Sequence, residues 1–213
     1  MTYEIKKITK KRNGNFNLYL KNYKEEKIQI HKEALYKSGI YKLDEIDSEE
    51  LSKVLLENEN LLAKDYALKS LGYSAKTLTE LRRKLFEKRF SKDSIEFALD
   101  FVKEKNLINE ELVAKSLMEG KFRKNKYSKR HIQNTLRQKG ISSEIISDLT
   151  SDIDSDEELE KALFYAEKKL RSLRNADTEE IKRKLRSTLS YRGFDYEIIN
   201  KAIRKTLKNI DED

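Results

Sequence analysis

Short runs of alternating apolar and polar residues open the chain. The segments FNLYLK and KIQIH place an apolar side chain at every second position, which is typical of half-buried strands. Asn13-Gly14 precedes the first of these segments and favours a hairpin turn, because both residues tolerate positive φ. The pattern predicts a small antiparallel β-meander over about residues 2–31.

The apolar spacing then changes to three and four residues, the period of a helix. It predicts a short helix over His31–Ser38 that ends at Gly39 and a second helix capped by Ser48. A separate third helix is expected over about Leu61–Leu71, ending near Gly72.

In the rest of the chain, one pattern of apolar residues occurs three times, at offsets of 51 and 53 residues. Two positions form an i, i+4 stripe on one helix, a third follows a corner, and a fourth lies on the next helix. The coinciding residues are Leu81, Ile132 and Leu185; Leu85, Leu136 and Leu189; Phe90, Ile141 and Phe194; and Ile95, Ile146 and Ile199. Each repeat therefore predicts two helices joined by a tight corner, with the third position filling the gap between them.

The corner has its own chemistry. Gly140 and Gly193 stand where the chain should enter the left-handed region, but the first repeat has Arg89 there. A non-glycine residue in that conformation costs about 1 kcal/mol. The N-cap positions of the following helices are occupied by Ser91, Ser142 and Asp195.

Each pair of helices needs an upstream helix to cover its stripe, and residues 61–71, 109–121 and 157–171 supply candidates. Thr77–Glu80 reads as a capping box opening the middle helix of the first repeat. The acidic segment Asp148–Glu160 is expected to be an exposed joint.

The predicted fold class is mainly α: tandem three-helix, helix-turn-helix-like repeats in an elongated curved array, preceded by a small N-terminal β-rich segment. The expected divisions are a β-meander extension over 1–47, a first helical module with its leading helix over 48–108, and second and third three-helix modules over 109–154 and 155–213.

Composition narrows the possible functions. The 213 residues are 39% charged, carry a net charge of +8, and include no cysteine. Thiolate chemistry is excluded, and a reducing, cytoplasmic location is expected. No apolar run is long enough for a membrane span, so no membrane partner is expected. The positive charge favours an anionic partner.

Catalytic patterns are missing from the sequence. His31 and His131 are far apart, neither belongs to a metal-binding pattern, and the six glycines form no phosphate-binding loop. A surface or partly packed position is the interpretation favoured for His131. We expect neither an enzyme nor a metal or cofactor site.

Gly120–Ser143 is the strongest local signal, because it contains eight basic residues and no acid. Such a stretch is suited to phosphates. Phe122 is expected to pack, whereas Tyr127 is left open between packing and stacking on a base. The basic residues are Lys121, Arg123, Lys124, Lys126, Lys129, Arg130, Arg137 and Lys139.

The other two repeats carry weaker basic clusters on their middle helices. The first has Arg82, Arg83, Lys84, Lys88, Arg89 and Lys92, and the third has Lys182, Arg183, Lys184, Arg186 and Arg192. If the modules stack in similar orientations, these helices could line one face.

The segments TELRRKLFEKRF, HIQNTLRQKGI and SYRGF, in this order, resemble the RecX family over about residues 61–208. Thr79, Glu80, Leu81, Leu85 and Phe90 match the first family unit, with Arg89 replacing its glycine. In the second unit Tyr127-Ser128 and His131-Ile132 replace the usual Gly-Pro and Arg-Ile, whereas Leu136, Lys139, Gly140 and Ile141 match. In the third unit the matching residues are Leu189, Arg192, Gly193 and Phe194.

The resemblance implies a non-enzymatic regulator, mainly an inhibitor, of the RecA recombinase. Such a protein would bind the RecA filament on single-stranded DNA, in its groove across successive protomers. It would limit filament growth, strand exchange and SOS co-protease activity. Arg82, Arg83, Lys88, Arg89, Lys121, Arg123, Lys124, Lys126, Lys129, Arg130, Arg137, Lys139 and Arg192 are the candidate residues for contacting RecA or DNA.

Two further points stay open at this level. Direct contact with DNA, to single strands and also to duplexes, is expected to be weak and salt-sensitive. The sequence contains no sustained heptad repeat that would predict a coiled coil, and a monomer is expected. The alternative function is an autonomous DNA-binding helical repeat protein that acts without RecA.

Overall fold

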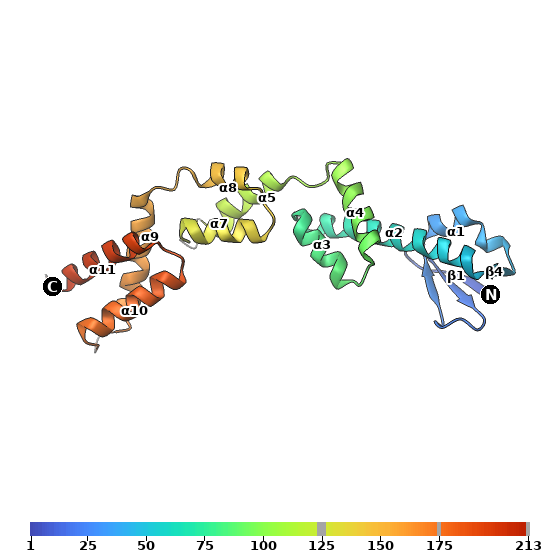
Figure 1. The fold of residues 1–213 in the computed structure, drawn as a ribbon, viewed down its shortest axis with the longest axis horizontal. Helices are drawn as coiled ribbons and strands as arrows, with labels where there is room; N and C mark the ends of the chain where they lie inside the picture. The colour runs from blue at the N-terminus through green and yellow to red at the C-terminus, as the bar shows by residue number, and fades with distance from the viewer. Residues whose placement is uncertain (123–126, 174–175, 212–213) are drawn as a thin grey trace. The chain divides into compact units, whose positions relative to one another are not determined.

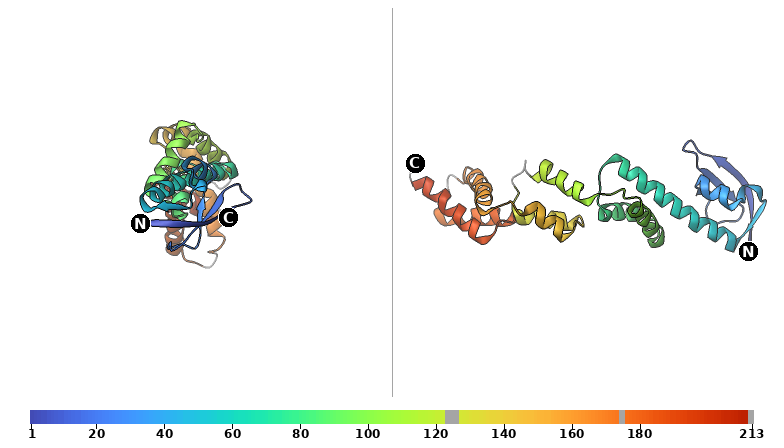
Figure 2. Two further views of the ribbon diagram at one scale, coloured as in Figure 1. Left: turned by 90° about the vertical axis from the view of Figure 1, so that its right-hand side faces the viewer. Right: turned by 90° about the horizontal axis from the view of Figure 1, so that it is seen from above.

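The computed structural model describes residues 1–122, 127–173 and 176–211. The chain divides into two compact units, Met1–Ile108 and Asn109–Asp213 (Figures 1 and 2). Each unit is described by itself.

The first unit begins with a four-stranded antiparallel sheet. Its strands are β1 (Thr2–Lys10), β2 (Phe16–Leu20), β3 (Ile28–Ile30) and β4 (Glu45–Asp47), in the order β3-β2-β1-β4. The predicted meander is confirmed for the first three strands. The fourth strand was not predicted. Its three residues carry a single apolar side chain, the buried Ile46, and one apolar residue shows no alternation.

A short helix, α1 (Lys32–Ser38), follows the meander as predicted. The His31 ring caps its first turn by accepting a hydrogen bond from the Glu33 amide, and Gly39 ends it in the left-handed region at φ 71°. A 3-10 turn, η1 (Ile40–Lys42), leads back to β4. Leu18, Ile30, Leu35 and other apolar residues of these elements form one core.

The prediction of two helices between Ser48 and Gly72 is wrong, since α2 runs unbroken from Ser48 to Tyr73. Its N-cap is Asp47, whose carboxylate accepts hydrogen bonds from the amides of Glu49 and Glu50. Among the polar residues in its middle, Asn58 is buried. Its side-chain oxygen accepts a hydrogen bond from the His31 amide at 2.7 Å, and its side-chain nitrogen donates to the Gln29 carbonyl at 2.9 Å.

The C-terminal half of α2 covers the first three-helix module, with α3 (Leu78–Glu87) and α4 (Lys92–Glu104). The capping box of Thr77 and Glu80 is present as predicted. At the corner between α3 and α4, Arg89 adopts φ 63°. The strain foreseen for this position is therefore real, about 1 kcal/mol for a residue with a Cβ.

The second unit holds two further modules. The second module of the chain consists of α5 (Glu110–Leu117) with the π-helical turn η2 (Met118–Phe122), α7 (Lys129–Gln138) and α8 (Ser143–Thr150). The other consists of α9 (Ser155–Leu170), α10 (Thr178–Tyr191) and α11 (Tyr196–Asp211). Their corner glycines adopt the predicted left-handed backbone, Gly140 at φ 83° and Gly193 at φ 82°.

The apolar repeat read from the sequence is the core of all three modules. Leu81, Ile132 and Leu185, the first aligned positions, are each at most 2% exposed. The corner residues Ile141 and Phe194 are buried, and Phe90 packs, partly buried, against its core. The apolar side chains at these positions therefore hold the helices of each module together. The basic residues between them are not part of this core.

No helix among the described residues combines the length and the apolar character needed to cross a bilayer.

Candidate interaction surface

The basic cluster of the first module lies at the surface, but two of its six residues are paired with acids. Arg82 makes two hydrogen bonds to Glu96 across the α3–α4 pair, and Arg83 lies 3.6 Å from Glu87. The hydrogen bond from Arg82 holds the pKa of the Glu96 carboxyl below its ordinary value. Both carboxylates therefore compete with any anionic partner for these arginines.

Lys88 and Arg89 follow at the exposed corner. The Lys88 ammonium lies 5.7 Å from the centre of the Tyr66 ring, a cation–π distance. Arg89 is exposed on the left-handed corner. These two cations are open to solvent.

In the second unit, α7 presents a polar stripe at the surface. Arg130, Asn134 and Arg137 are exposed at spacings of four and three residues, so they share one face. Arg137 donates to the Asn134 side-chain oxygen at 3.2 Å, and Arg130 lies 4.0 Å from Asp195. The stripe is available to a partner.

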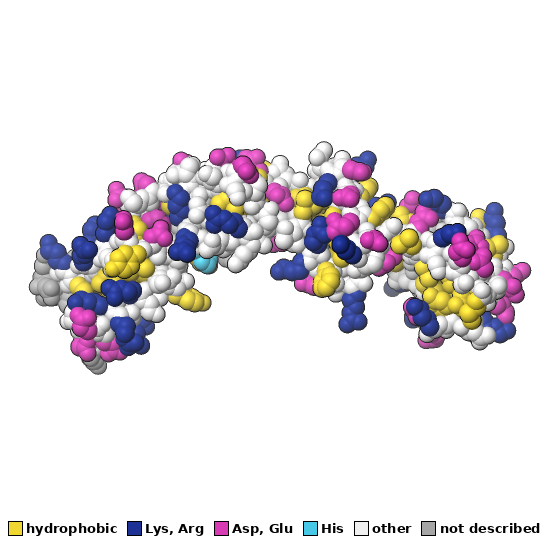
Figure 3. Space-filling view, viewed as in Figure 1, with side chains coloured by type: hydrophobic (Ala, Val, Ile, Leu, Met, Phe, Trp, Pro, Cys, Tyr) yellow, Lys and Arg dark blue, Asp and Glu magenta, His cyan; other side chains and the backbone are white. Residues whose placement is uncertain are grey.

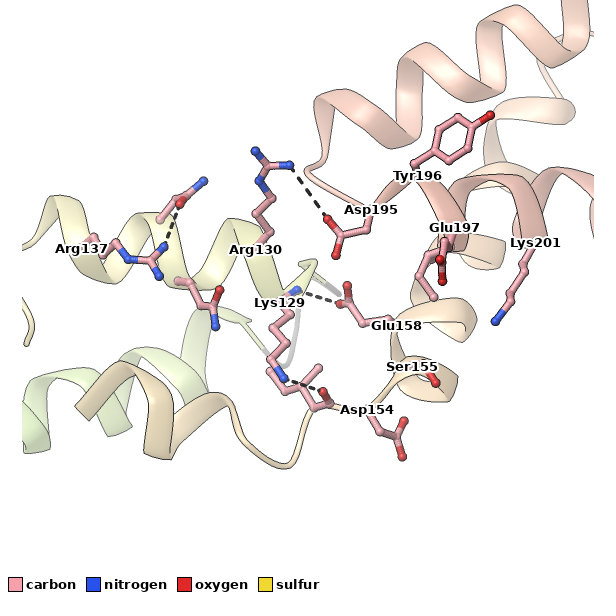
Figure 4. Close-up of a pocket in the computed structure, with 14 residues that line it drawn as sticks. Lys129, Arg130, Arg137, Asp154, Ser155, Glu158, Asp195, Tyr196, Glu197 and Lys201 are labelled. Carbon is pink, nitrogen blue, oxygen red and sulfur yellow. Dashed lines mark hydrogen bonds and ion pairs between the residues drawn. The ribbon is translucent and has the colours of Figure 1, made fainter. Parts of the chain in front are cut away.

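Lys129, predicted as a contact residue, instead links the two modules. Its ammonium donates to the Ile153 carbonyl at 3.1 Å, and its amide donates to the Glu158 carboxylate at 2.7 Å (Figure 4). Because Lys129 is the first residue of α7, a carboxylate from α9 satisfies an amide at the start of α7.

Arg192 is likewise engaged inside the second unit. Its guanidinium stacks 3.6 Å from the centre of the Tyr165 ring, and its carbonyl accepts a hydrogen bond from the Ser128 hydroxyl at 2.8 Å. A Cβ at the neighbouring Gly193 would lie 3.0 Å from that hydroxyl. Glycine therefore suits position 193 for two reasons. The backbone there has a positive φ, and a side chain would obstruct the close approach of the two modules.

Between these modules lies an open groove with a volume of about 970 Å³. Four basic and four acidic side chains line it, so it is not a basic surface alone (Figure 4). The charged lining residues are Lys129, Arg130, Arg137, Lys201, Asp154, Glu158, Asp195 and Glu197. A partner in this groove would have to match both signs.

The expectation of an exposed acidic joint over Asp148–Glu160 is correct for six of its seven acids and wrong for Glu158. Both of its ends are helical, and Glu158 is buried. Burial raises the pKa of the Glu158 carboxyl, and the hydrogen bond from the Lys129 amide opposes this rise. Sequence reasoning missed this residue because an acid among many acids carries no signal of burial.

Of the two interpretations left open for Tyr127, packing and stacking on a base, the structure supports packing. Tyr127 is partly buried against the core of the second module, and its ring stacks on that of His131 at 4.3 Å between centroids. His131 is thus partly packed, as favoured above.

Several predicted residues cannot be placed in this surface. Arg123, Lys124 and Lys126 lie outside the described residues. Lys121 belongs to the π-helical turn η2, and Lys139 is the half-buried C-cap of α7.

Basic and acidic side chains are interspersed on the face of each unit shown in Figure 3. Among the described residues no group of His, Asp or Glu is placed to hold a metal ion.

Comparison with known proteins identifies the modules. Models of the first, second and third three-helix domains of RecX match residues 63–101, 109–149 and 156–203. The Regulatory protein RecX of Clostridioides difficile (strain 630) is 35% identical, over 87% of this chain and 86% of the relative. This chain belongs to the RecX family.

The family predicted from the residues is therefore confirmed, and it is one of regulators and not of enzymes. The Regulatory protein RecX of Clostridium botulinum (strain Eklund 17B / Type B) is 32% identical over 96% of this chain and 94% of its own length.

Solved RecX structures share the fold. A crystal structure of a regulatory protein RecX superposes with a TM-score of 0.64 at 23% identity, over 93% of this chain and 97% of that one. A crystal structure of RecX from Lactobacillus salivarius superposes with a TM-score of 0.54 at 23% identity, over 70% of this chain and 97% of that one.

Proposed function

We propose that this protein regulates the RecA recombinase, mainly as an inhibitor, by binding the RecA filament on single-stranded DNA. The observation that carries the proposal is the presence of three RecX domains in tandem along one chain. Bound to the filament, the protein limits filament growth, strand exchange and the SOS co-protease activity.

The binding mode that we propose is insertion into the helical groove of the filament, across successive protomers. Exposed cations support it in two modules, Arg89 on the first and Arg130 and Arg137 on the second. They would meet acidic RecA surface or DNA phosphates, while the acids of the 109–213 groove select partners that also carry positive charge. A monomer suffices for this mode.

The test is the ATPase activity of a RecA filament on single-stranded DNA. We expect the full chain to suppress this activity at a substoichiometric ratio, because one molecule bound in the groove affects several protomers. Heat-denatured protein at the same ratio is the control. Suppression that requires one molecule per RecA protomer would contradict the groove mode, and no suppression would contradict the function.

A second candidate function, an autonomous DNA-binding protein, is favoured by the stripe on α7. Arg and Asn are the side chains that most often read guanine and adenine edges, and Arg130, Asn134 and Arg137 share one face. Tight, sequence-dependent binding to duplex DNA without RecA would support this function. Weak, salt-sensitive and sequence-blind binding would support the first.

A further inference from the structure

A small cleft in the first unit, where α2 ends and α3 begins, is lined only by polar, aromatic and cationic side chains. Its volume is about 280 Å³, and among the described residues no Asp or Glu lines it. The lining includes Tyr66, Tyr73, Ser74, Lys69, Lys76 and Lys84. A concave site with three cations and no acid on its walls is suited to an anion.

Lys76 forms the fixed base of the cleft. It is only 7% exposed, and its ammonium donates to the Ser70 carbonyl at 2.5 Å, the Ser74 carbonyl at 2.8 Å and the Ser74 hydroxyl at 2.7 Å. Burial, and after it the positive charge of Lys84, lowers the pKa of Lys76. This ammonium also offsets the negative end of α2, which would otherwise repel an anion.

The other two lysines are free to bind. Neither Lys69 nor Lys84 has an ion pair or hydrogen-bond partner among the described residues, whereas the neighbouring Arg82 and Arg83 are paired with acids. Unpaired positive charge in this module therefore lies at the cleft as well as at Lys88 and Arg89.

We propose that this cleft binds a backbone phosphate of single-stranded nucleic acid. Lys69 and Lys84 hold the phosphate, Lys76 supplies a fixed positive field beneath it, and Tyr73 stacks on an adjacent base. The Tyr73 ring is 78% exposed at the rim, as a stacking platform must be. The proposal rests on the proposed function and deepens it by giving the DNA strand of the filament a contact point on the first module.

Nucleic acid fits the cleft better than an acidic protein segment does. Lysine ammonium groups act as point charges that phosphates accept without a fixed geometry. The exposed Tyr73 adds a ring face that bases use and carboxylate side chains do not.

The experiment uses the full chain without RecA and a fluorescein-labelled oligothymidylate, with affinity measured by anisotropy over a range of salt concentrations. We expect Lys69→Ala/Lys84→Ala to weaken binding about tenfold at low salt and to reduce the slope of log affinity against log salt by about 1. Lys53→Ala/Lys103→Ala is the matched control. It removes the same charge from lysines that are paired with Glu49 and Asp100, and should stay within about twofold of the parent chain.

Three results would overturn the proposal. One is a loss of affinity in the cleft variant that does not exceed the loss in the control variant. Another is displacement of the oligonucleotide by poly-glutamate of equal charge as readily as by unlabelled DNA, which would assign the cleft to an acidic protein. The third is thermal stabilisation by inorganic phosphate that the cleft variant abolishes while oligonucleotide affinity stays the same, which would assign it to a free anion.

The ATPase assay separates this proposal from the proposed function. A parent chain that fails to suppress RecA activity contradicts the function, whatever the cleft variant binds. A parent chain that suppresses RecA activity, with a cleft variant that binds the oligonucleotide as tightly as the parent, contradicts only the cleft.

Discussion

Glu158 is a single side chain on which the contact between two modules depends. Its carboxylate is buried and accepts the hydrogen bond of the Lys129 amide at 2.7 Å. Burying a charge is costly even with a good partner, so this carboxylate stabilises the contact by its geometry more than by its charge.

The raised pKa of Glu158 fixes the sign of a pH effect. The folded state binds the proton more tightly than the unfolded chain, so this group's contribution to the free energy of unfolding falls as the pH rises from about 4 towards neutrality. We expect Glu158→Gln, which keeps an acceptor but no charge, to unfold at higher urea concentration than the parent at pH 7. The two proteins should converge at about pH 4.

Glu158→Ala is the contrasting variant, because it removes the acceptor as well as the charge. The partly buried amide of Lys129 then lacks this partner, at a cost of about 1–3 kcal/mol in the free energy of unfolding. Equal effects of the Gln and Ala variants at pH 7 would show that the hydrogen bond contributes nothing.

At the scale of the element, α2 has an unusual position, since one helix serves two cores. Leu51, Val54 and Leu61 pack with the sheet, and Ala63 and Ala67 pack with the first module. Asn58, between Val54 and Leu61, connects the helix to the Gln29 carbonyl of β3 and to the amide of His31, which joins β3 to α1.

We expect Asn58→Ala to lower the free energy of unfolding by about 2 kcal/mol, measured by urea denaturation. The substitution leaves the His31 amide and the Gln29 carbonyl without their partner in a buried place. Leu56→Ala, at an exposed position of the same helix, should change stability by less than about 0.5 kcal/mol. Equal effects of the two substitutions would contradict the role of Asn58.

The elements differ in how well the sequence predicts them. The module helices follow from the spacing of Leu81, Leu85 and Ile95, because the apolar period of a helix is local. The unbroken α2 does not follow, because the burial of Asn58 depends on a partner 27 residues away. For the same reason charge alone suggested Lys129 and Arg192 as contact residues, although each is held by a group distant in sequence.

On the scale of the whole molecule, three modules share one core pattern but expose different charges. If the stripe on α7 contacts the filament, Arg130→Glu/Arg137→Glu should weaken suppression of the RecA ATPase activity about tenfold at low salt. Because salt screens exposed charges, the difference should shrink above about 0.3 M salt.

Lys168→Glu/Lys205→Glu is the matched control, since it makes the same change of charge at exposed positions of α9 and α11. Equal weakening by both double variants would mean that net charge, and not the α7 stripe, determines inhibition.

The shared cap between α7 and α9 has a consequence for how the chain comes apart. An array of independent repeats unfolds one repeat at a time, with each transition set by the stability of that repeat. Here Glu158 of one module completes a helix of the other, and Ser128 and Arg192 add a second bond between the same two modules. We therefore expect residues 109–213 to unfold as one cooperative unit built from two repeats, and not as two separate repeats.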